Sequence, residues 1–341
     1  LAREQAEARL QEMLREERQR GFDFAQAPLL RLRLVKFAED DWRIVQSHHH
    51  ALIDAWCRGL MLAEFFAQYR ARLQGRSLHV PPARPYRDFI AWLAQQDEAA
   101  SRGYWREALA GFDTVTPLPY RRQQGEAGIQ DVSLALDEAQ TRALAEQARR
   151  HQLTVNTLVQ AAWALLLMRY SGRDDVLFGV TVAGRPTELE GIEEALGLFI
   201  NTLPLRVQLP GEGASGLHLL QALQVQNAGM RQHEQLSLAE VQNLADTPRG
   251  QPLFDSLFVF ENVPLGGEVQ EAVEAYRITP LANRTHTNYP LTVVLLPGSS
   301  LTLQLSFDTQ QFAVADMQVL VEHFRRVLLQ LSQAPQRPLA E

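Results

Sequence analysis

Cysteine and lysine are almost missing from this sequence of 341 residues, in which Cys57 is the only cysteine and Lys36 the only lysine. A single cysteine excludes an internal disulfide and a metal site built from several cysteines, and it fits a reducing compartment. The sequence also lacks an uninterrupted apolar run of about 18 residues and a signal peptide, so neither a membrane span nor secretion is predicted. Arginine in place of lysine is typical of a GC-rich genome.

Acidic residues outnumber basic ones, 40 to 33, so the net charge is −7 and the isoelectric point is about 5.8. Without a basic stripe and interleaved aromatic residues, binding to nucleic acid is not expected. No glycine-rich phosphate loop is present. The apolar share of 46% is that of a globular protein, and the length exceeds what one ordinary core needs, which favours two lobes.

Strands and helices are mixed along both halves of the sequence. Alternating apolar and polar residues predict strands, and the first strand should have one solvent-exposed face. Apolar residues at helical spacing predict amphipathic helices, and the strongly apolar segment 154–172 predicts a buried helix. This pattern favours an α+β fold in two halves. The best linker candidate is 112–128, and 334–341 resembles the start of an interdomain linker. The predicted helices are 1–20, 56–75, 88–111, 137–152, 154–172, 215–234 and 314–333, and the strands are 28–37, 40–48, 129–137, 175–185, 196–209, 253–263, 291–298 and 300–308. The first two strands and the last two are each expected to form a hairpin, and Asp137 is a plausible N-cap of the helix that follows it.

Three consecutive histidines stand out in the stretch QSHHHALIDAWC, residues 46–57. They cannot all bind one metal ion, because neighbouring side chains on a strand point to opposite faces and no second ligand cluster follows. His48 alone is most simply a packed core residue. A catalytic role is open to the others, since imidazole can hold or take a proton near neutral pH. No G-x-S-x-G motif is present and Cys57 shows no sign of being a nucleophile, so we expect no covalent acyl-enzyme.

The segment HHALIDA resembles the HHxxxDG signature of condensation domains from nonribosomal peptide synthetases. Further segments are similar to later or flanking parts of the same family, and they occur in the family's order over nearly the whole chain. Five such matches in order are far more specific than H-x-x-x-D alone, which related acyltransferases share. The segments are RGFDFAQAPLLRLRL, YWREALAG, GLFINTLPLRV, RQHEQLSLAEVQ and GQPLFDSLFVFENVP.

The resemblance implies an α+β pseudodimer of two lobes like chloramphenicol acetyltransferase, which form a V around a central tunnel. Residues 1–112 would be the N-terminal lobe, incomplete at its N-terminus because the two earliest motifs are absent. Residues 113–333 would be the C-terminal lobe and 334–341 the start of a linker. We expect possible partners of the motif aspartate in the absent part.

The resemblance also implies an acyltransferase that forms a peptide bond. A donor acyl thioester and an acceptor aminoacyl thioester would arrive on the phosphopantetheine arms of two carrier proteins. The domain itself would bind no cofactor and no metal, act as a monomer beside an adenylation domain, and lie in the bacterial cytoplasm, away from membranes and nucleic acid. Three alternatives stay open: an epimerization domain, an inactive relative that docks carriers or another enzyme, and a free-standing acyltransferase.

Carried over by position, His50 is the motif histidine that faces the tunnel, as a general base or, as we favour, in positioning the amine. His49 and Asp54 are expected to be structural. Two positions depart from the family pattern. Ala55 replaces the glycine of the signature. If this position needs positive φ, alanine would lower the free energy of unfolding by about 1 kcal/mol; its side chain could also narrow the tunnel. Cys57 stands where a serine is common. The residues expected to line the tunnel are Ala55, Trp56, Phe199, Asn201 and Thr202. For Phe199, Asn201 and Thr202, packing between the lobes is the alternative role.

Overall fold

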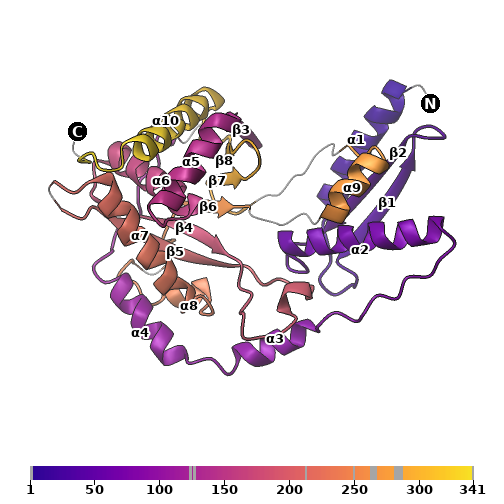
Figure 1. Cartoon of the computed structure of the whole chain (residues 1–341), viewed down its shortest axis with the longest axis horizontal. Helices are drawn as coiled ribbons and strands as arrows, with labels where there is room; N and C mark the ends of the chain where they lie inside the picture. Colours follow the sequence, from indigo (N-terminus) through magenta and orange to yellow (C-terminus); the bar gives the residue numbers. More distant parts are fainter. Residues whose placement is uncertain are drawn as a thin grey trace. The chain divides into compact units, whose positions relative to one another are not determined.

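A computed structural model describes residues 3–122, 125, 128–211, 213–248, 250–261, 267–279 and 287–339 (Figure 1). The chain forms two compact units, each assembled from separate segments. They differ from the predicted lobes, whose boundaries at residues 112 and 334 stay predictions, as do the V-shaped pseudodimer and its tunnel. Unit 1 consists of Leu1–Ile90, Arg185–Phe199 and Val263–Ile278, and unit 2 of Ala91–Gly184, Ile200–Asn262 and Thr279–Glu341.

Unit 1 carries the histidine stretch at the end of a β-hairpin. β1 (Leu30–Lys36) and β2 (Trp42–His48) pair antiparallel, which confirms the predicted hairpin, and Leu34 lies opposite Ile44. The hairpin follows α1 (Arg3–Arg20) and leads into α2 (Ala55–Leu73) and α3 (Tyr86–Leu93). A short 3-10 helix, η1 (Ile192–Glu194), comes from a later segment of the chain.

The hairpin has one exposed face, as predicted, but this face is the apolar one. Leu32, Leu34 and Ile44 are 56%, 63% and 56% exposed. On the opposite face Arg33 Nε donates to Glu17 Oε2 at 2.7 Å, and Arg31 Nη2 donates to the Gly21 carbonyl at 2.7 Å. The end of α1 therefore supplies acceptors to the arginine face, which the alternation of residue types within the strand cannot reveal.

A second helix of unit 1 comes from far along the chain. α9 (Gly267–Ala275) packs on α2, and Phe66, Val269 and Ala272 form the buried centre of this contact. No helix is predicted there from the sequence. Because each of the two helices covers the other's apolar side, the pair explains how short segments from opposite ends of the sequence stabilise one unit.

Unit 2 is built on a mixed six-stranded sheet in the order β3-β8-β7-β6-β4-β5. β6 is parallel to β4 and β7, and the other pairs are antiparallel; the predicted β7–β8 hairpin is confirmed. The strands are β3 (Ile129–Ala135), β4 (Asp175–Val182), β5 (Asn201–Gln208), β6 (Ser256–Phe260), β7 (Leu291–Leu296) and β8 (Thr302–Asp308).

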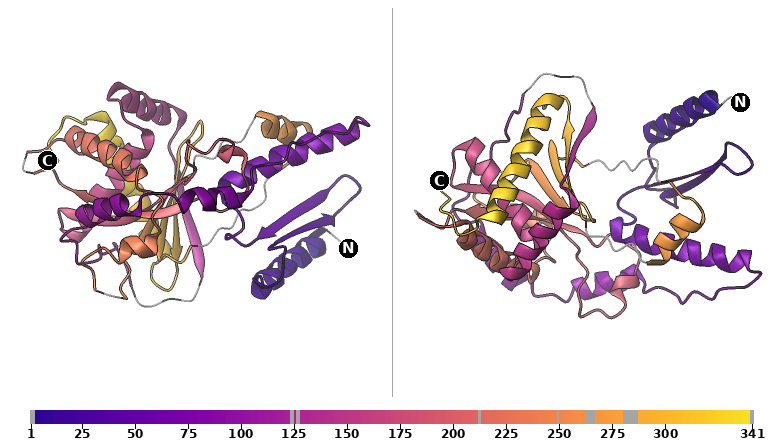
Figure 2. Two further views of the ribbon diagram at one scale, coloured as in Figure 1. Left: turned by 90° about the horizontal axis from the view of Figure 1, so that it is seen from below. Right: turned by 45° about the horizontal axis from the view of Figure 1, so that its top comes forward.

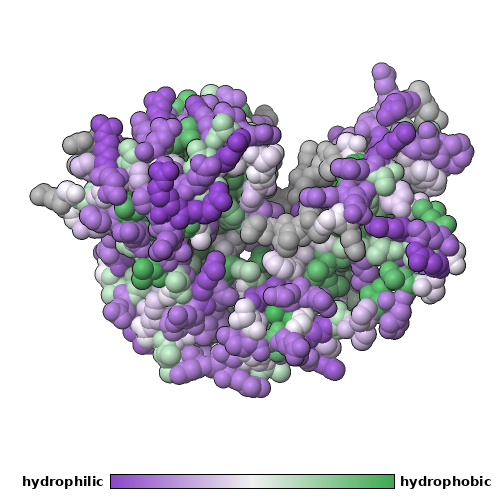
Figure 3. Space-filling model, viewed as in Figure 1, coloured by the Kyte–Doolittle hydropathy of each residue, from purple (hydrophilic) through white to green (hydrophobic). Residues whose placement is uncertain are grey.

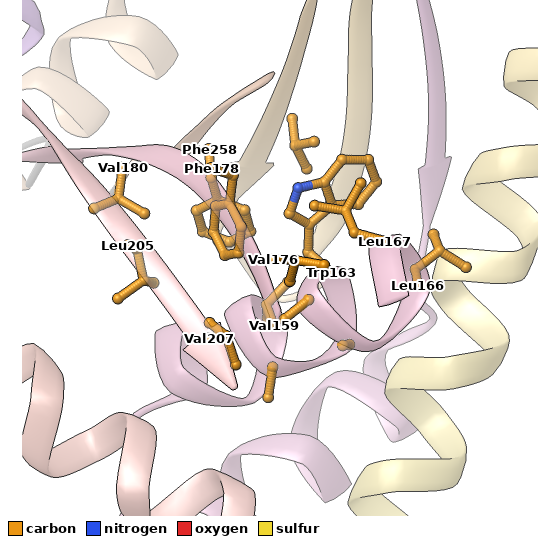
Figure 4. Packing of buried hydrophobic residues seen from close by; sticks show 14 of the residues in the cluster. Val159, Trp163, Leu166, Leu167, Val176, Phe178, Val180, Leu205, Val207 and Phe258 are labelled. Carbon is orange, nitrogen blue, oxygen red and sulfur yellow. The ribbon is translucent and has the colours of Figure 1, made fainter. Parts of the chain in front are cut away.

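Helices α5 (Glu138–Arg150), α6 (Val155–Ser171), α7 (Gly216–Arg231) and α10 (Val314–Gln333) complete the core of unit 2. α10 packs against β3 and β8, and α6 packs against β4 and α10 (Figure 2). Val159 and Trp163 of α6 are fully buried beside Phe178 and Phe258 of the sheet (Figure 4). The prediction that 154–172 is a buried helix is therefore confirmed.

The single helix predicted over 88–111 is wrong, because Asp97 starts a new helix. Its side chain accepts from the backbone N–H groups of Ala99 at 2.9 Å and Ala100 at 3.2 Å, and so caps α4 (Glu98–Ala108). Ser237 begins the short α8 (Leu238–Gln242) with a capping box, which the sequence analysis misses.

Hydrophilic side chains predominate on the face of the molecule that Figure 3 shows. Within the described ranges, none of the helices has the length and apolar character needed to cross a membrane.

Candidate active site

The histidine stretch forms the turn between β2 and α2. The His49 N–H donates to the Leu29 carbonyl at 3.0 Å, and the Leu52 N–H donates to the His49 carbonyl at 3.0 Å. The Ala51 N–H also donates to His49 Nδ1 at 3.1 Å, which leaves the ring hydrogen on Nε2. The ring centroid of His49 lies 4.5 Å from that of Phe24, so both the turn and an aromatic neighbour hold this imidazole. These contacts support the structural role expected for it.

The other two histidines of the stretch have different surroundings. His50 lies in the turn and its side chain is exposed. His48 is half-buried at the end of β2; burial lowers the pKa of its imidazole, and the positive charges available to His50, Arg58 and His49 lower it further. His48 is therefore held neutral near pH 7. Of the three rings, only that of His50 stands open to solvent.

The motif aspartate is enclosed at the start of α2. Asp54 is 2% exposed; its Oδ1 accepts from the Cys57 N–H at 3.1 Å, and its Oδ2 accepts from the Phe199 N–H at 3.1 Å. The first bond caps α2, and the second joins α2 to the segment around Gly197, whose carbonyl accepts from the Asp54 N–H at 3.3 Å. Asp54 thus fixes the end of the turn that carries His50.

A buried arginine that the sequence analysis misses completes this junction. The side chain of Arg185 is 4% exposed, and its Nη2 lies 3.4 Å from Asp54 Oδ1. Its Nη1 donates to the carbonyls of Ile192 and of Ala195, the latter at 3.0 Å. The guanidinium also lies 4.0 Å from the ring centroid of Phe199. Asp54 therefore has a cationic partner within this chain.

Cys57 and Gly197 pack tightly at the same junction. Cys57 is fully buried, and its Sγ lies 3.3 Å from the Gly197 N–H donor and 3.2 Å from the Gly197 carbonyl. Burial raises the pKa of the Cys57 thiol, so the protonated form, which is not nucleophilic, is favoured. A Cβ on Gly197 would lie 2.1 Å from the Tyr86 ring. The glycine of the GLFINT segment is thus required by a close aromatic neighbour.

The expected tunnel residues fall into both units. In unit 1, Trp56 Nε1 donates to the Glu193 carbonyl at 2.9 Å, and Phe199, 3% exposed, packs edge-on against Tyr86 and Phe89. The structure therefore gathers Trp56 and Phe199 around the turn of His50 and Asp54. Whether these side chains line a tunnel stays a prediction.

Asn201 and Thr202 begin β5 in unit 2. The Asn201 amide nitrogen donates to the carbonyls of Glu234 and Leu236, both at 2.8 Å, and its Oδ1 accepts from the Thr202 N–H at 2.8 Å. The side-chain amide is thus engaged with the loop after α7. These contacts favour packing over substrate binding for Asn201.

Ala55 is the first residue of α2 and has no backbone strain. The described non-glycine residues with positive φ are Tyr120, Gln152 and Arg277. The backbone at position 55 therefore does not need positive φ, and alanine there does not have the cost in stability that replacing a positive-φ glycine would have.

We expect Ala55→Gly to lower the free energy of unfolding by up to about 1 kcal/mol, because glycine loses more backbone entropy in a helix than alanine. Urea denaturation of the variant measures this change. Ala139→Gly, in the exposed first turn of α5, is the matched control and should show a similar loss. A gain in stability on Ala55→Gly would contradict the unstrained geometry.

Comparison with known proteins decides the family. The family model described as Condensation domain matches residues 1–341. This chain is a condensation domain. It is 42% identical over 335 residues to one of the subunits of the linear gramicidin synthase of Brevibacillus parabrevis; the match covers 96% of this chain but only 6% of that relative.

Two solved structures show the same fold at low sequence identity. One is the first condensation domain of the calcium-dependent antibiotic synthetase in complex with a substrate analogue, with a TM-score of 0.70, 20% identity, and coverage of 92% of this chain and 69% of that one. The other is the complex of the X-domain and OxyB from teicoplanin biosynthesis, with a TM-score of 0.75, 22% identity, and coverage of 94% and 74%. The α+β fold expected from the resemblance is therefore confirmed.

Proposed function

We propose that this condensation domain forms an amide bond between a donor acyl or peptidyl thioester and an acceptor aminoacyl thioester. The acceptor nitrogen attacks the thioester carbonyl, the new C–N bond forms as the C–S bond breaks, and the nitrogen loses a proton while the departing sulfur gains one. The observation that carries this proposal is a contrast within the motif turn. His49 is held by hydrogen bonds and Asp54 is buried, whereas the side chain of His50 is exposed to solvent.

His50 would act directly on the attacking amine. A thioester is already activated, so most of the acceleration can come from holding amine and carbonyl together in the right orientation. A neutral imidazole can accept a hydrogen bond from the amine, or take its proton as the C–N bond forms. Asp54 and Arg185 would act only through the turn, because both are buried and bound to backbone groups.

The substrates would be carried on the phosphopantetheine arms of two peptidyl carrier proteins, and an adenylation domain would lie beside this domain in a larger synthetase. The small share of the gramicidin synthase relative that the chain spans, 6%, supports a place among many domains. No cofactor is required for the attack of an amine on a thioester. Among the residues that the structure describes, no group of three metal-binding side chains is found.

The experiment that tests this proposal mixes the chain with two carrier proteins, one loaded with an acyl group and the other with an amino acid. Intact-mass analysis should show the acyl mass moving from the donor carrier to the acceptor carrier. An inverted stereocentre without mass transfer would instead favour an epimerization domain. Binding of loaded carriers without any product would favour a docking role, which the fold shared with the X-domain keeps as the second candidate.

A further inference from the structure

The segment predicted as a linker is attached to unit 2 along its described part. Thr116 is 2% exposed, and its Oγ1 accepts from the Leu177 N–H of β4 at 2.8 Å. Leu118 is 8% exposed, and the Arg122 N–H donates to the Gln311 carbonyl at 2.7 Å. Bonding and burial of this kind are typical of a fixed segment and differ from those of a flexible linker.

Tyr120, in the middle of the segment, joins two helices through a chain of hydrogen bonds. Its Oη lies 2.8 Å from Tyr170 Oη on α6, which lies 2.7 Å from His323 Nδ1 on α10. Burial, and then the bond with Tyr120, raise the pKa of Tyr170, so the Tyr170 phenol stays protonated and able to donate. Tyr120 also has φ of 60°, a conformation that residues other than glycine adopt rarely. Such a conformation persists where surrounding contacts enforce it.

Two arginines close the end of the segment. Arg121 pairs with Asp255, just before β6, and its Nε donates to Gln311 Oε1 at 2.9 Å. Arg122 pairs with Asp316 in the first turn of α10. Each pair is partly exposed, so the pairs alone would hold the segment weakly and would be screened by salt.

We propose that residues 116–122 are a conformational clasp, which ties β4, α6, α10 and the loops beside β6 and β8 into one body. The Tyr120–Tyr170–His323 chain of hydrogen bonds holds the segment against α6 and α10. The two arginine pairs add weaker contacts at the end of the segment. Residues 116–122 then do not serve as a hinge, and they leave the surface of unit 2 only when the chain of hydrogen bonds opens.

Limited digestion with trypsin tests the clasp, because Arg121 is itself a cleavage site. The measured quantity is the rate of cleavage after Arg121 divided by the rate after Arg150, at the end of α5 in the same unit. Tyr170→Phe keeps the ring and removes both hydrogen bonds, so this ratio should rise at least about tenfold. Tyr120→Phe removes one bond and should give a smaller rise. Tyr69→Phe, at a half-exposed tyrosine of α2, is the control and should leave the ratio unchanged.

Two outcomes would overturn the clasp. One is cleavage after Arg121 in the unaltered chain as fast as cleavage after the exposed Arg18 near the end of α1. The other is a ratio that stays constant in Tyr120→Phe and Tyr170→Phe, since the hydrogen bonds would then support unit 2 as a whole and not this segment. If Tyr170→Phe does not fold, the Tyr120→Phe ratio alone decides.

Discussion

His50→Ala should slow product formation between two loaded carrier proteins by at least about 100-fold, the size of effect typical of one well-placed imidazole. Because the His50 side chain is exposed in a turn whose hydrogen bonds come from other residues, the substitution should leave the free energy of unfolding within about 0.5 kcal/mol. Intact-mass measurement of the acceptor carrier over time gives the rate, and urea denaturation checks the fold.

His50→Gln separates the two roles open to this imidazole. A glutamine amide oxygen can accept a hydrogen bond from the attacking amine, but it cannot take a proton at neutral pH. If His50 positions the amine, Gln should restore much of the rate lost in Ala; if it is a general base, both variants should be equally slow. His79→Ala, at an exposed histidine outside the helices and strands, is the control and should react at the original rate. An undiminished rate in His50→Ala would remove His50 from the reaction.

The sequence predicts much of the fold where the information is local. The strongly apolar character of 154–172 predicts a buried helix, and α6 is one. The apolar run before the turn at 297–301 and the alternating run after it predict the β7–β8 hairpin, which needs no distant partner to define it. Asp137 is likewise recognisable as the N-cap of α5, where it forms a capping box with Gln140.

Contacts between distant segments could not be predicted in this way. Asp54 and Arg185 are separated by 131 positions, and no local pattern relates them. The same holds for α9 on α2 and for the arginine face of the β1–β2 hairpin, whose acceptors are Glu17 of α1 and the Gly21 carbonyl just after it. For the site, the motif identifies His49, His50 and Asp54. A buried carboxylate needs a cationic partner, so the sequence indicates that some basic residue pairs with Asp54. It does not indicate which arginine this is.

Arg185→Met should lower the free energy of unfolding of unit 1 by about 3–5 kcal/mol, the cost of removing one partner of a buried ion pair. The methionine fills a similar volume, but the fully buried side chain of Asp54 loses its cationic partner. The carbonyls of Ile192 and Ala195 lose the guanidinium donor at the same time, although the Ile192 carbonyl keeps the bond from the Ala195 N–H. Urea denaturation measures the loss. Arg325→Ala removes a pair on α10 that is 35% and 51% exposed, so that control should lose less than about 1 kcal/mol.

A double-mutant cycle with Asp54→Asn shows whether the loss arises from the charge left behind. Asparagine keeps an oxygen that can accept from the Cys57 N–H, but it carries no charge that needs Arg185. The double variant should therefore be more stable than the sum of the single losses implies, by more than about 1 kcal/mol. Strict additivity would mean that Arg185 acts through its backbone acceptors and Phe199 alone. In that case Asp54 would be stabilised by the N–H groups of Cys57 and Phe199, and the turn that presents His50 would not depend on a buried cation.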